Sequence, residues 1–228
     1  MFDDKRILGI IPARGGSKEI PRKNIKEIGG KPLIAWTIIE AKKSKYIDRL
    51  ILSSEDEEVV TIAKHWGCDV PFIRPKEFAK DDAPGVDPVI HALEKLPNFD
   101  YVVLLQPTSP LRSVEDIDNC VKMCIQRRAK ACVSVTESTK NPYWMYKMRE
   151  NYQIIPLLGQ EFITRRQDLP MVYALNGAVF VAETEFLKQS RSFITSETIA
   201  YTMPQFRSID IDTEFDMKIC EYLLLSYR

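Results

Sequence analysis

The stretch ILGIIPARGGSKEIPRKN, residues 7–24, decides the fold. It begins as an apolar run rich in β-branched residues and continues into a polar loop with two adjacent glycines and several cations. The apolar run predicts a buried strand. Open α/β sheets bind ligands at the carboxyl ends of their parallel strands. The whole stretch therefore indicates such a strand followed by a binding loop.

Similar apolar runs recur along the chain and alternate with segments of helical periodicity. The runs are residues 7–11, 50–53, 70–73, 101–105, 131–135 and 178–181. This alternation predicts a single α/β domain over residues 1–228, with a mostly parallel sheet and helices on both faces. Between residues 137 and 173 the pattern gives way to Pro, Tyr, Trp, Met and Arg without a clear period, which favours an inserted arm. Asn176-Gly177, just after the arm, is typical of a turn.

Helix starts are marked by a hydroxyl residue three positions before an acid, the spacing of an N-terminal capping box. The pairs are Ser54 with Glu57, Ser113 with Asp116, and Thr213 with Asp216. In the last helix we expect an apolar stripe made of Phe215, Ile219, Tyr222 and Leu223.

Composition excludes some functions. The 32 Lys and Arg residues balance 32 Asp and Glu residues, so no overall field attracts nucleic acid or an anionic membrane. No stretch has the length of a membrane span, and the first residues lack a secretory signal. The five cysteines, an odd number, favour reduced thiols and a cytoplasmic protein. A zinc site at Cys120 and Cys124 is the less favoured alternative to buried thiols.

The glycine-rich loop predicts a phosphate site. Glycines let backbone N–H groups approach a phosphate, and cations supply the countercharge. The cations here are Arg14, Lys18, Arg22 and Lys23, arranged around Gly15-Gly16. The loop matches neither a Walker motif nor a dinucleotide fingerprint. The alternative is a solvated basic turn, which has no need of paired glycines.

Two further segments carry polar groups. Gln106-Pro107-Thr108-Ser109-Pro110-Leu111-Arg112 follows a buried run, so it emerges at the same sheet edge; it suits a polar ligand or an ordinary turn equally well. Asp210 and Asp212 lie two residues apart, which on an extended strand places both carboxylates on one side. Such a pair favours a divalent cation, although Asp212 also suits the N-terminus of a helix.

Five segments in order resemble the bacterial CMP-sialic acid synthetases, the acylneuraminate cytidylyltransferases. They are residues 10–24, Gly30-Lys31-Pro32-Leu33, the Gln106–Arg112 segment, Asn176-Gly177-Ala178, and Ser208-Ile209-Asp210-Ile211-Asp212. The resemblance covers nearly the whole chain. It implies a Rossmann-like nucleotidyltransferase fold and a homodimer whose arm reaches the partner's site. It also implies a reaction in which CTP and a nine-carbon α-keto acid sugar give the CMP-sugar and pyrophosphate.

The resemblance also implies roles for individual residues. The catalytic set is Lys23, Asp210 and Asp212, with Arg165 and Arg166 of the arm acting across the dimer. Asp210 and Asp212 match the family's Mg²⁺ ligands. The nucleotide-binding set is Arg14, Gly15, Gly16, Ser17, Lys18, Asn24 and Arg74, and the sugar-facing set is Gln106, Thr108 and Ser109. From the residues alone, Arg74 and the arm arginines suit surface ion pairing as well.

Three departures from the family pattern concern the substrate. Glu19 stands where many relatives have glycine, Pro84-Gly85-Val86 where sialate-specific relatives tend to have hydroxyl residues, and Ala174-Leu175 where relatives often carry an arginine. A relative acting on legionaminic or pseudaminic acid therefore fits almost as well.

The competing functions are a CMP-octulosonate synthetase, a metal-dependent glycosyltransferase, and a non-catalytic nucleotide-binding relative. Lys23 and the two aspartates favour an enzyme, and an aspartate pair so near the C-terminus argues against the glycosyltransferase.

Overall fold

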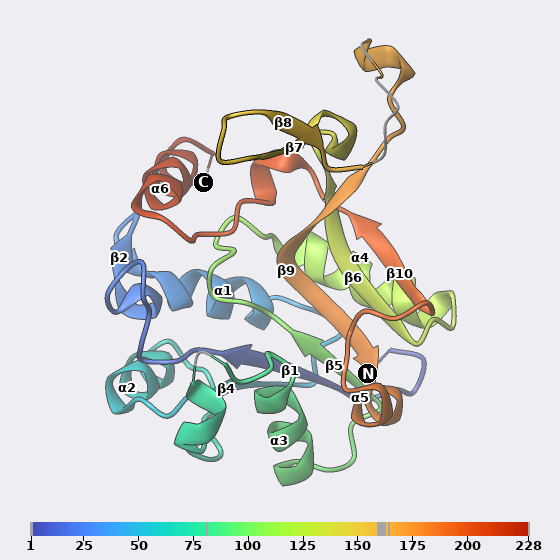
Figure 1. The fold of residues 1–228 in the computed structure, drawn as a ribbon. Helices are drawn as coiled ribbons and strands as arrows, with labels where there is room; N and C mark the ends of the chain where they lie inside the picture. Colours follow the sequence, from blue (N-terminus) through green and yellow to red (C-terminus); the bar gives the residue numbers. More distant parts are fainter. Residues whose placement is uncertain (1, 81, 159–162, 164, 228) are drawn as a thin grey trace.

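A computed structural model describes residues 2–80, 82–158, 163 and 165–227. Within these residues the main sheet has six strands in the order β10-β6-β9-β5-β1-β4 (Figure 1). The strands are β1 (Ile7–Pro12), β4 (Arg49–Ser53), β5 (Tyr101–Leu104), β6 (Ala131–Glu137), β9 (Tyr173–Glu183) and β10 (Thr198–Thr202). β9 runs antiparallel to β5 and β6, and the other pairings are parallel. The predicted mixed, mostly parallel sheet is confirmed.

Helices cover both faces of this sheet. One buried cluster joins it to α1 (Leu33–Lys42), α2 (Glu57–His65) and α4 (Val114–Gln126). A second cluster on the opposite face joins it to α3 (Asp87–Lys95) and α5 (Thr184–Ser190). A third joins the outer side of α1 to α6 (Glu214–Tyr227) and to the small β2–β3 hairpin (Glu27–Ile28 and Lys31–Pro32). Short 3-10 turns lie at Lys23–Ile25, Lys76–Ala79 and Gln205–Arg207.

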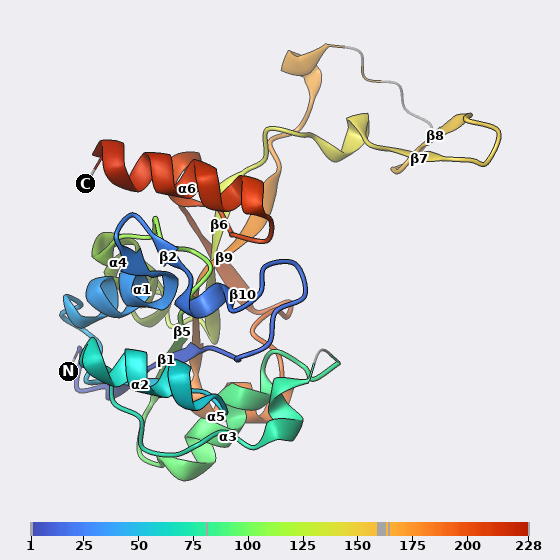
Figure 2. The ribbon, with the colours of Figure 1, turned by 90° about the vertical axis from the view of Figure 1, so that its left-hand side faces the viewer.

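The segment between β6 and β9 leaves the sheet and projects from the body of the molecule (Figure 2). It contains the hairpin of β7 (Tyr146–Met148) and β8 (Ile154–Pro156), with 3-10 turns at Pro142–Trp144 and Arg166–Asp168. We call residues 138–172 the arm. Large apolar side chains are exposed along it, among them Trp144, Tyr146, Met148, Ile154 and Leu157.

One strand prediction and one turn prediction are corrected. Residues 70–73 do not form a strand; only Asp69 makes a single parallel bridge, to Ile51. Pro71 interrupts the run because it lacks the N–H group that a ladder requires, and Ile73 is exposed. Asn176-Gly177 does not form a turn but lies inside β9. Gly177 has φ +70°, and the pairing with β6 shifts register between Val133 and Val135, which indicates a bulge.

The helix signals are confirmed in part. Capping boxes form at Ser113 with Asp116 and at Thr213 with Asp216. Ser54 does not cap α2; Asp56 does, accepting from the N–H groups of Glu58 and Val59. The predicted stripe on α6 is wrong for Phe215 and Tyr222, which are exposed, whereas Leu223 is partly buried against the third cluster. The helix packs instead through Met217, Cys220 and Leu224, which lie on one face at spacings of three and four.

The five cysteines are all described, free and buried. Cys120 and Cys132 lie with their sulfur atoms 3.6 Å apart between α4 and β6. Among the described residues no cluster of three or more His, Cys, Asp and Glu side chains is arranged to hold a metal, so the buried-thiol interpretation is the one the geometry supports. No described helix combines the length and apolarity needed to cross a bilayer.

Candidate active site

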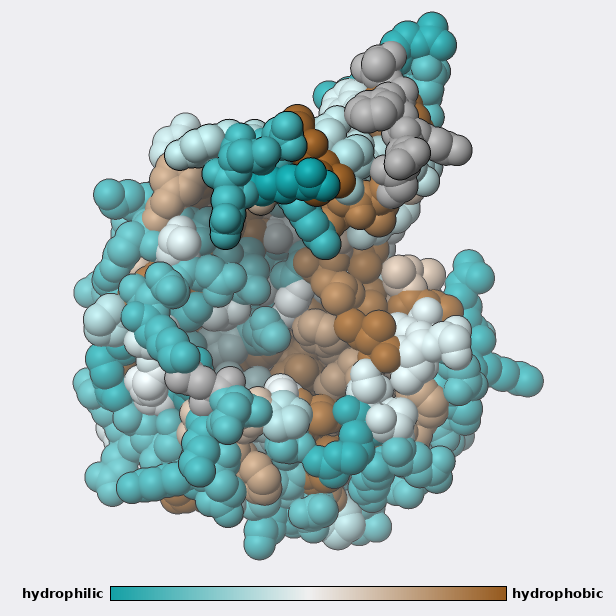
Figure 3. All heavy atoms as spheres, in the orientation of Figure 1, coloured by the Kyte–Doolittle hydropathy of each residue, from teal (hydrophilic) through white to brown (hydrophobic). Residues whose placement is uncertain are grey.

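A cleft of about 410 Å³ opens at the carboxyl ends of β1 and β5. The face seen in Figure 3 is hollowed at its centre. Segments far apart in the sequence line this cleft: the loop after β1, residues 74–88, the loop after β5, and the loop before α6. Ten of the predicted site residues meet there: Arg14, Gly16, Ser17, Lys23, Asn24, Arg74, Gln106, Thr108, Asp210 and Asp212.

Five predicted residues do not line the cleft. Lys18 is exposed and borders a shallow hollow beside it, together with Arg14, Gly16 and Ser17. Ser109 is fully buried, so its side chain does not reach the cleft. Arg165 and Arg166 lie on the arm, where Arg165 pairs with Asp168. Gly15, the fifth, is turned toward α2.

Gly15 and Gly16 play different parts in the loop after β1. A β-carbon added at Gly15 would stand 2.2 Å from Asp56 Oδ2, so the glycine permits close packing of the loop on α2. A β-carbon at Gly16 would meet nothing within 4 Å. Gly16 therefore leaves room on the cleft side. Of the two glycines only Gly16 lines the cleft, and the approach of a ligand to this loop stays a prediction.

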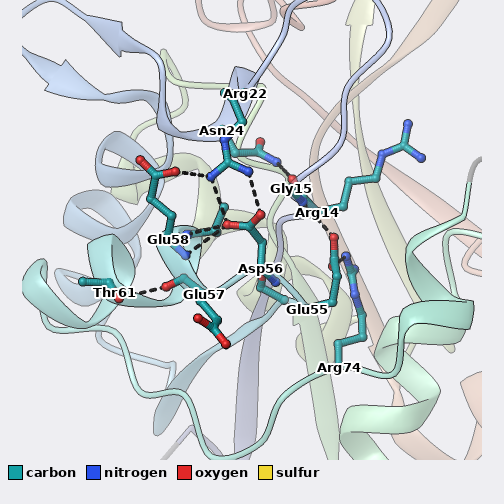
Figure 4. A network of polar contacts seen from close by, with 12 residues as sticks. Arg14, Gly15, Arg22, Asn24, Glu55, Asp56, Glu57, Glu58, Thr61 and Arg74 are labelled. Carbon is teal, nitrogen blue, oxygen red and sulfur yellow. Dashed lines mark hydrogen bonds and ion pairs between the residues drawn. The ribbon is translucent and has the colours of Figure 1, made fainter.

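Acidic residues at the start of α2 hold this loop in place (Figure 4). Arg22 adopts a left-handed conformation at φ 59° and donates to both Asp56 oxygens, at 2.6 and 3.0 Å, and also to Glu58. The Arg22 hydrogen bond holds the pKa of Asp56 below its ordinary value. Arg22 is thus committed to α2, which corrects its predicted role as countercharge for a phosphate.

Glu55 is a site residue that the sequence pattern did not reveal. Its Oε1 accepts from the Gly15 N–H at 2.8 Å, and its Oε2 accepts from the buried Arg74 guanidinium. Arg74 also lines the cleft, so Glu55 joins the loop after β1 to a second cleft segment. The only signal in the sequence was an acidic residue shortly after β4. Its partners, Gly15 and Arg74, are distant in the sequence and are brought to Glu55 by the tertiary fold.

Lys23 and Asn24 connect the loop to its surroundings. Lys23 Nζ donates to the Ile211 carbonyl at 2.7 Å and lies 3.4 Å from Asp212 Oδ1. Asn24 Nδ2 donates to the Arg14 carbonyl at 2.9 Å, which closes the loop on itself. Lys23 therefore places one positive charge between the loop and the two aspartates.

Asp210 and Asp212 lie in an irregular loop rather than on the predicted strand, yet both face the cleft. Asp212 is largely exposed, whereas Asp210 is mostly shielded from solvent. Burial, together with the charge of Asp212, raises the pKa of Asp210 above its ordinary value. Among the described residues Asp210 Oδ1 has no hydrogen-bond partner. A buried, unpaired carboxylate oxygen beside a second carboxylate fits a hard divalent cation such as Mg²⁺.

The bulge in β9 lies close to both the Gln106 amide and the Asp210 carboxylate. A β-carbon added at Gly177 would lie 2.8 Å from Gln106 Oε1 and 3.1 Å from Asp210 Oδ2. Only a glycine with positive φ allows Gln106 and Asp210 to approach the strand in this way. Gly177 is therefore part of the site, although the Asn-Gly pair suggested only a turn.

The three departures occupy different positions. Glu19 is exposed and does not line the cleft, whereas Pro84 and Gly85 do line it. Ala174 and Leu175 lie on the exposed first part of β9.

Comparison with known proteins relates the chain to one family. A family model described as cytidylyltransferase matches residues 8–213. The chain is 34% identical to CMP-N,N'-diacetyllegionaminic acid synthase of Legionella pneumophila, over 96% of both chains. It is 33% identical to a pseudaminic acid cytidylyltransferase of Campylobacter jejuni, over 95% of both. It is 32% identical to an N-acylneuraminate cytidylyltransferase of Escherichia coli, over 94% of this chain and 51% of that one.

Solved structures share the fold. A structure of CMP:2-keto-3-deoxy-manno-octonic acid synthetase complexed with CTP matches 98% of this chain and all of that one, with a TM-score of 0.75 and 14% identity. A 4-diphosphocytidyl-2C-methyl-D-erythritol synthase from Anaerococcus prevotii matches 98% of this chain with a TM-score of 0.67 and 17% identity. These likenesses support the predicted nucleotidyltransferase architecture.

Proposed function

Because the chain belongs to the cytidylyltransferase family, we propose that it transfers CMP from CTP to a nine-carbon α-keto acid sugar and releases pyrophosphate. One observation carries this proposal: a single cleft brings together the cationic loop, the Gln106 loop and the aspartate pair. The three segments supply what nucleotidyl transfer needs, namely countercharge for a triphosphate, polar groups for a sugar, and ligands for a cation.

In the proposed reaction the anomeric hydroxyl of the sugar attacks the α-phosphorus of CTP in line with the departing pyrophosphate. Negative charge builds on the phosphate oxygens, and Arg14 and Lys23 are placed to stabilise it. Gln106 and Thr108, which also line the cleft, would orient the sugar. When bound at Asp210 and Asp212, Mg²⁺ would compensate charge on the triphosphate and the attacking oxygen.

For the sugar we propose an N-acylneuraminate or a related nonulosonic acid. Legionaminic and pseudaminic acids form the second candidate class. Relatives named for these two sugars match this chain along nearly their whole length. Pro84 and Gly85, which together belong to one of the three departures, line the cleft.

We further propose a homodimer in which the arm of one subunit reaches the site of the other. Arg165 and Arg166 do not line the cleft of their own chain. The arm also exposes the side chains of Trp144, Met148 and Ile154, which favours burial against a partner.

A pyrophosphate-release assay tests the proposal. Purified protein with Mg²⁺ is offered CTP, UTP, ATP or GTP, each with N-acetylneuraminic, N,N'-diacetyllegionaminic, pseudaminic or 3-deoxy-octulosonic acid. We expect release with CTP and a nine-carbon acid, and a CMP-sugar of matching mass. Release with the octulosonic acid alone would contradict the sugar class. Binding of CTP without release from any pair would favour the non-catalytic relative.

A further inference from the structure

We infer that Arg207, through its pair with Asp116, is a positioning residue that fixes the loop carrying Asp210 and Asp212. The inference rests on the proposed function, because it concerns how those two carboxylates are held for a divalent cation. Arg207 does not line the cleft and so acts only through this loop.

The loop needs such support because it has no regular structure of its own. Residues 208–212 form neither helix nor strand and connect the 3-10 turn at Gln205–Arg207 to α6. No continuous ladder of backbone hydrogen bonds fixes its path, so contacts from distant parts of the chain must do so.

The first anchor is a two-point ion pair. Arg207 Nε donates to Asp116 Oδ2 at 2.8 Å, and Arg207 Nη2 donates to Asp116 Oδ1 at 2.9 Å. Asp116 is fully buried at the start of α4, where its Oδ2 also accepts from the Ser113 N–H at 3.0 Å. This planar, two-point geometry fixes both the position and the direction of the Arg207 side chain. A lysine provides the same charge without this geometry.

The second anchor is the next residue. Ser208 Oγ accepts from Asn176 Nδ2 at 2.9 Å, and Asn176 is itself buried in the β9 bulge. Asn176 Oδ1 in turn accepts from Ser134 Oγ of β6 at 2.6 Å. Two successive residues at the start of the loop are therefore tied to α4 on one side and to the sheet on the other.

The far end of the loop is held as well. Ile211 is fully buried, its N–H donates to the Thr108 carbonyl at 2.8 Å, and its carbonyl accepts from Lys23. Asp210 lies between these anchors and lines the cleft together with Asp212. Two like charges on a loose loop would move apart, so a rigid support is required to keep them as a preformed pair.

The test compares Arg207→Lys and Arg207→Gln with the wild-type protein. Mn²⁺ binding without nucleotide is measured from the electron paramagnetic resonance signal of the free ion, and CTP binding in chelator by calorimetry. We expect the dissociation constant for Mn²⁺, and the Mg²⁺ concentration giving half-maximal rate, to rise by about fivefold or more. The dissociation constant for CTP should stay within about twofold of wild type, because the cationic loop is untouched.

Arg49→Lys is the matched control, since Arg49 also donates through Nε and Nη2 to one aspartate, Asp69, and lies at the amino-terminal end of β4, away from the carboxyl ends of the strands where the cleft opens. This variant should change neither the dissociation constant for Mn²⁺ nor that for CTP.

Ser208→Ala removes only the second anchor and is used if the Arg207 variants fail to fold. It should also raise the dissociation constant for Mn²⁺. Unchanged Mn²⁺ binding in folded variants would overturn the inference, as would equal losses of Mn²⁺ and CTP binding. A wild-type enzyme that works fully in chelator would instead remove the proposed metal role, and the inference with it.

Discussion

Lys23 is the cation most directly placed to act on a bound triphosphate, because it lies between the loop after β1 and the aspartate pair. We expect Lys23→Ala to lower kcat/KM for CTP by about tenfold or more, equal to about 1.4 kcal/mol of transition-state stabilisation. Lys26→Ala is the control, since Lys26 pairs with Glu214 and does not line the cleft. Equal kinetics in the two variants would remove Lys23 from the mechanism.

The two aspartates differ in burial, and this difference predicts different effects of their replacement on stability. Burial raises the pKa of Asp210, so the folded state disfavours its charged form near neutral pH, while the unfolded state does not. Asp210→Asn should therefore raise the melting temperature in chelator, and the gain should vanish at a pH below the ordinary carboxyl pKa. In a chain of this size 1 kcal/mol corresponds to about 2–4 °C.

Asp212 provides the comparison for that measurement. Its side chain is 73% exposed, so Asp212→Asn should leave the melting temperature nearly unchanged. Turnover should nevertheless fall by orders of magnitude in both variants, with CTP binding retained. Scanning calorimetry and steady-state rates check the pair together. A lower melting temperature for Asp210→Asn would show that its charge stabilises the fold, contrary to the expectation.

At the scale of elements, the start of α2 shapes the loop after β1. Glu55→Asp keeps the charge but shortens the side chain, so one carboxylate no longer reaches both the Gly15 N–H and Arg74. We expect the dissociation constant for CTP to rise by about tenfold, the equivalent of about one charge-assisted hydrogen bond. Glu57→Asp is the control, because Glu57 is an exposed acid two residues further along, at the first position of α2. Tighter binding in Glu55→Asp would mean that Glu55 competes with the triphosphate.

The burial of each strand explains which strands could be predicted from the sequence and which could not. The runs that became β1, β5 and β6 are continuously apolar because both faces of these strands are covered, and this local signal predicts them well. β10 was missed because an edge strand is only half buried and its residues, TIAYT, show no apolar run. Residues 70–73 were predicted as a strand because they are mostly apolar. Pro71 lacks the backbone N–H group that pairing in a sheet requires, and this local signal outweighs the apolar pattern.

For the site, the sequence identified the residues that face the cleft better than those that support them. Arg14, Lys23 and Gln106 carry chemistry in their side chains and follow strand ends, so their position is predictable from the order of elements. Glu55 and Arg207 act through partners that are distant in the sequence or in another element, and no local spacing encodes such a pairing. The same limit hid the buried stripe of α6, whose partners are α1 and the β2–β3 hairpin.

At the scale of the whole molecule, the arm predicts a shared site. If Arg165 and Arg166 act across a dimer, a Lys23→Ala protein and an Arg165→Ala/Arg166→Ala protein are each strongly impaired at both sites, but a mixed dimer regains one intact site. Refolding the two proteins together in equal amounts should restore roughly a quarter of wild-type activity, because about half of the dimers are mixed and each carries one intact site of two. No recovery on mixing would refute action across the dimer.

The exposed apolar residues of the arm give a second test of assembly. Met148→Lys/Ile154→Lys places charges on the β7–β8 hairpin and should shift the protein to a monomer of low activity, as measured by light scattering. Tyr222→Lys/Leu225→Lys changes equally exposed residues on α6 and should leave the mass unchanged. A wild-type protein that is monomeric and fully active would contradict the shared site.

Alkylation of the five buried thiols can measure local unfolding of the protein. Burial raises the pKa of Cys68, Cys124 and Cys220 to about 12, and the thiolate is the form that alkylating reagents attack. Labelling in native buffer must therefore wait for local unfolding. Cys220 reports the undocking of α6, while Cys120, Cys124 and Cys132 report the separation of α4 from the sheet. The order in which mass spectrometry finds these sites labelled will rank the parts of the molecule by local stability, without any engineered probe.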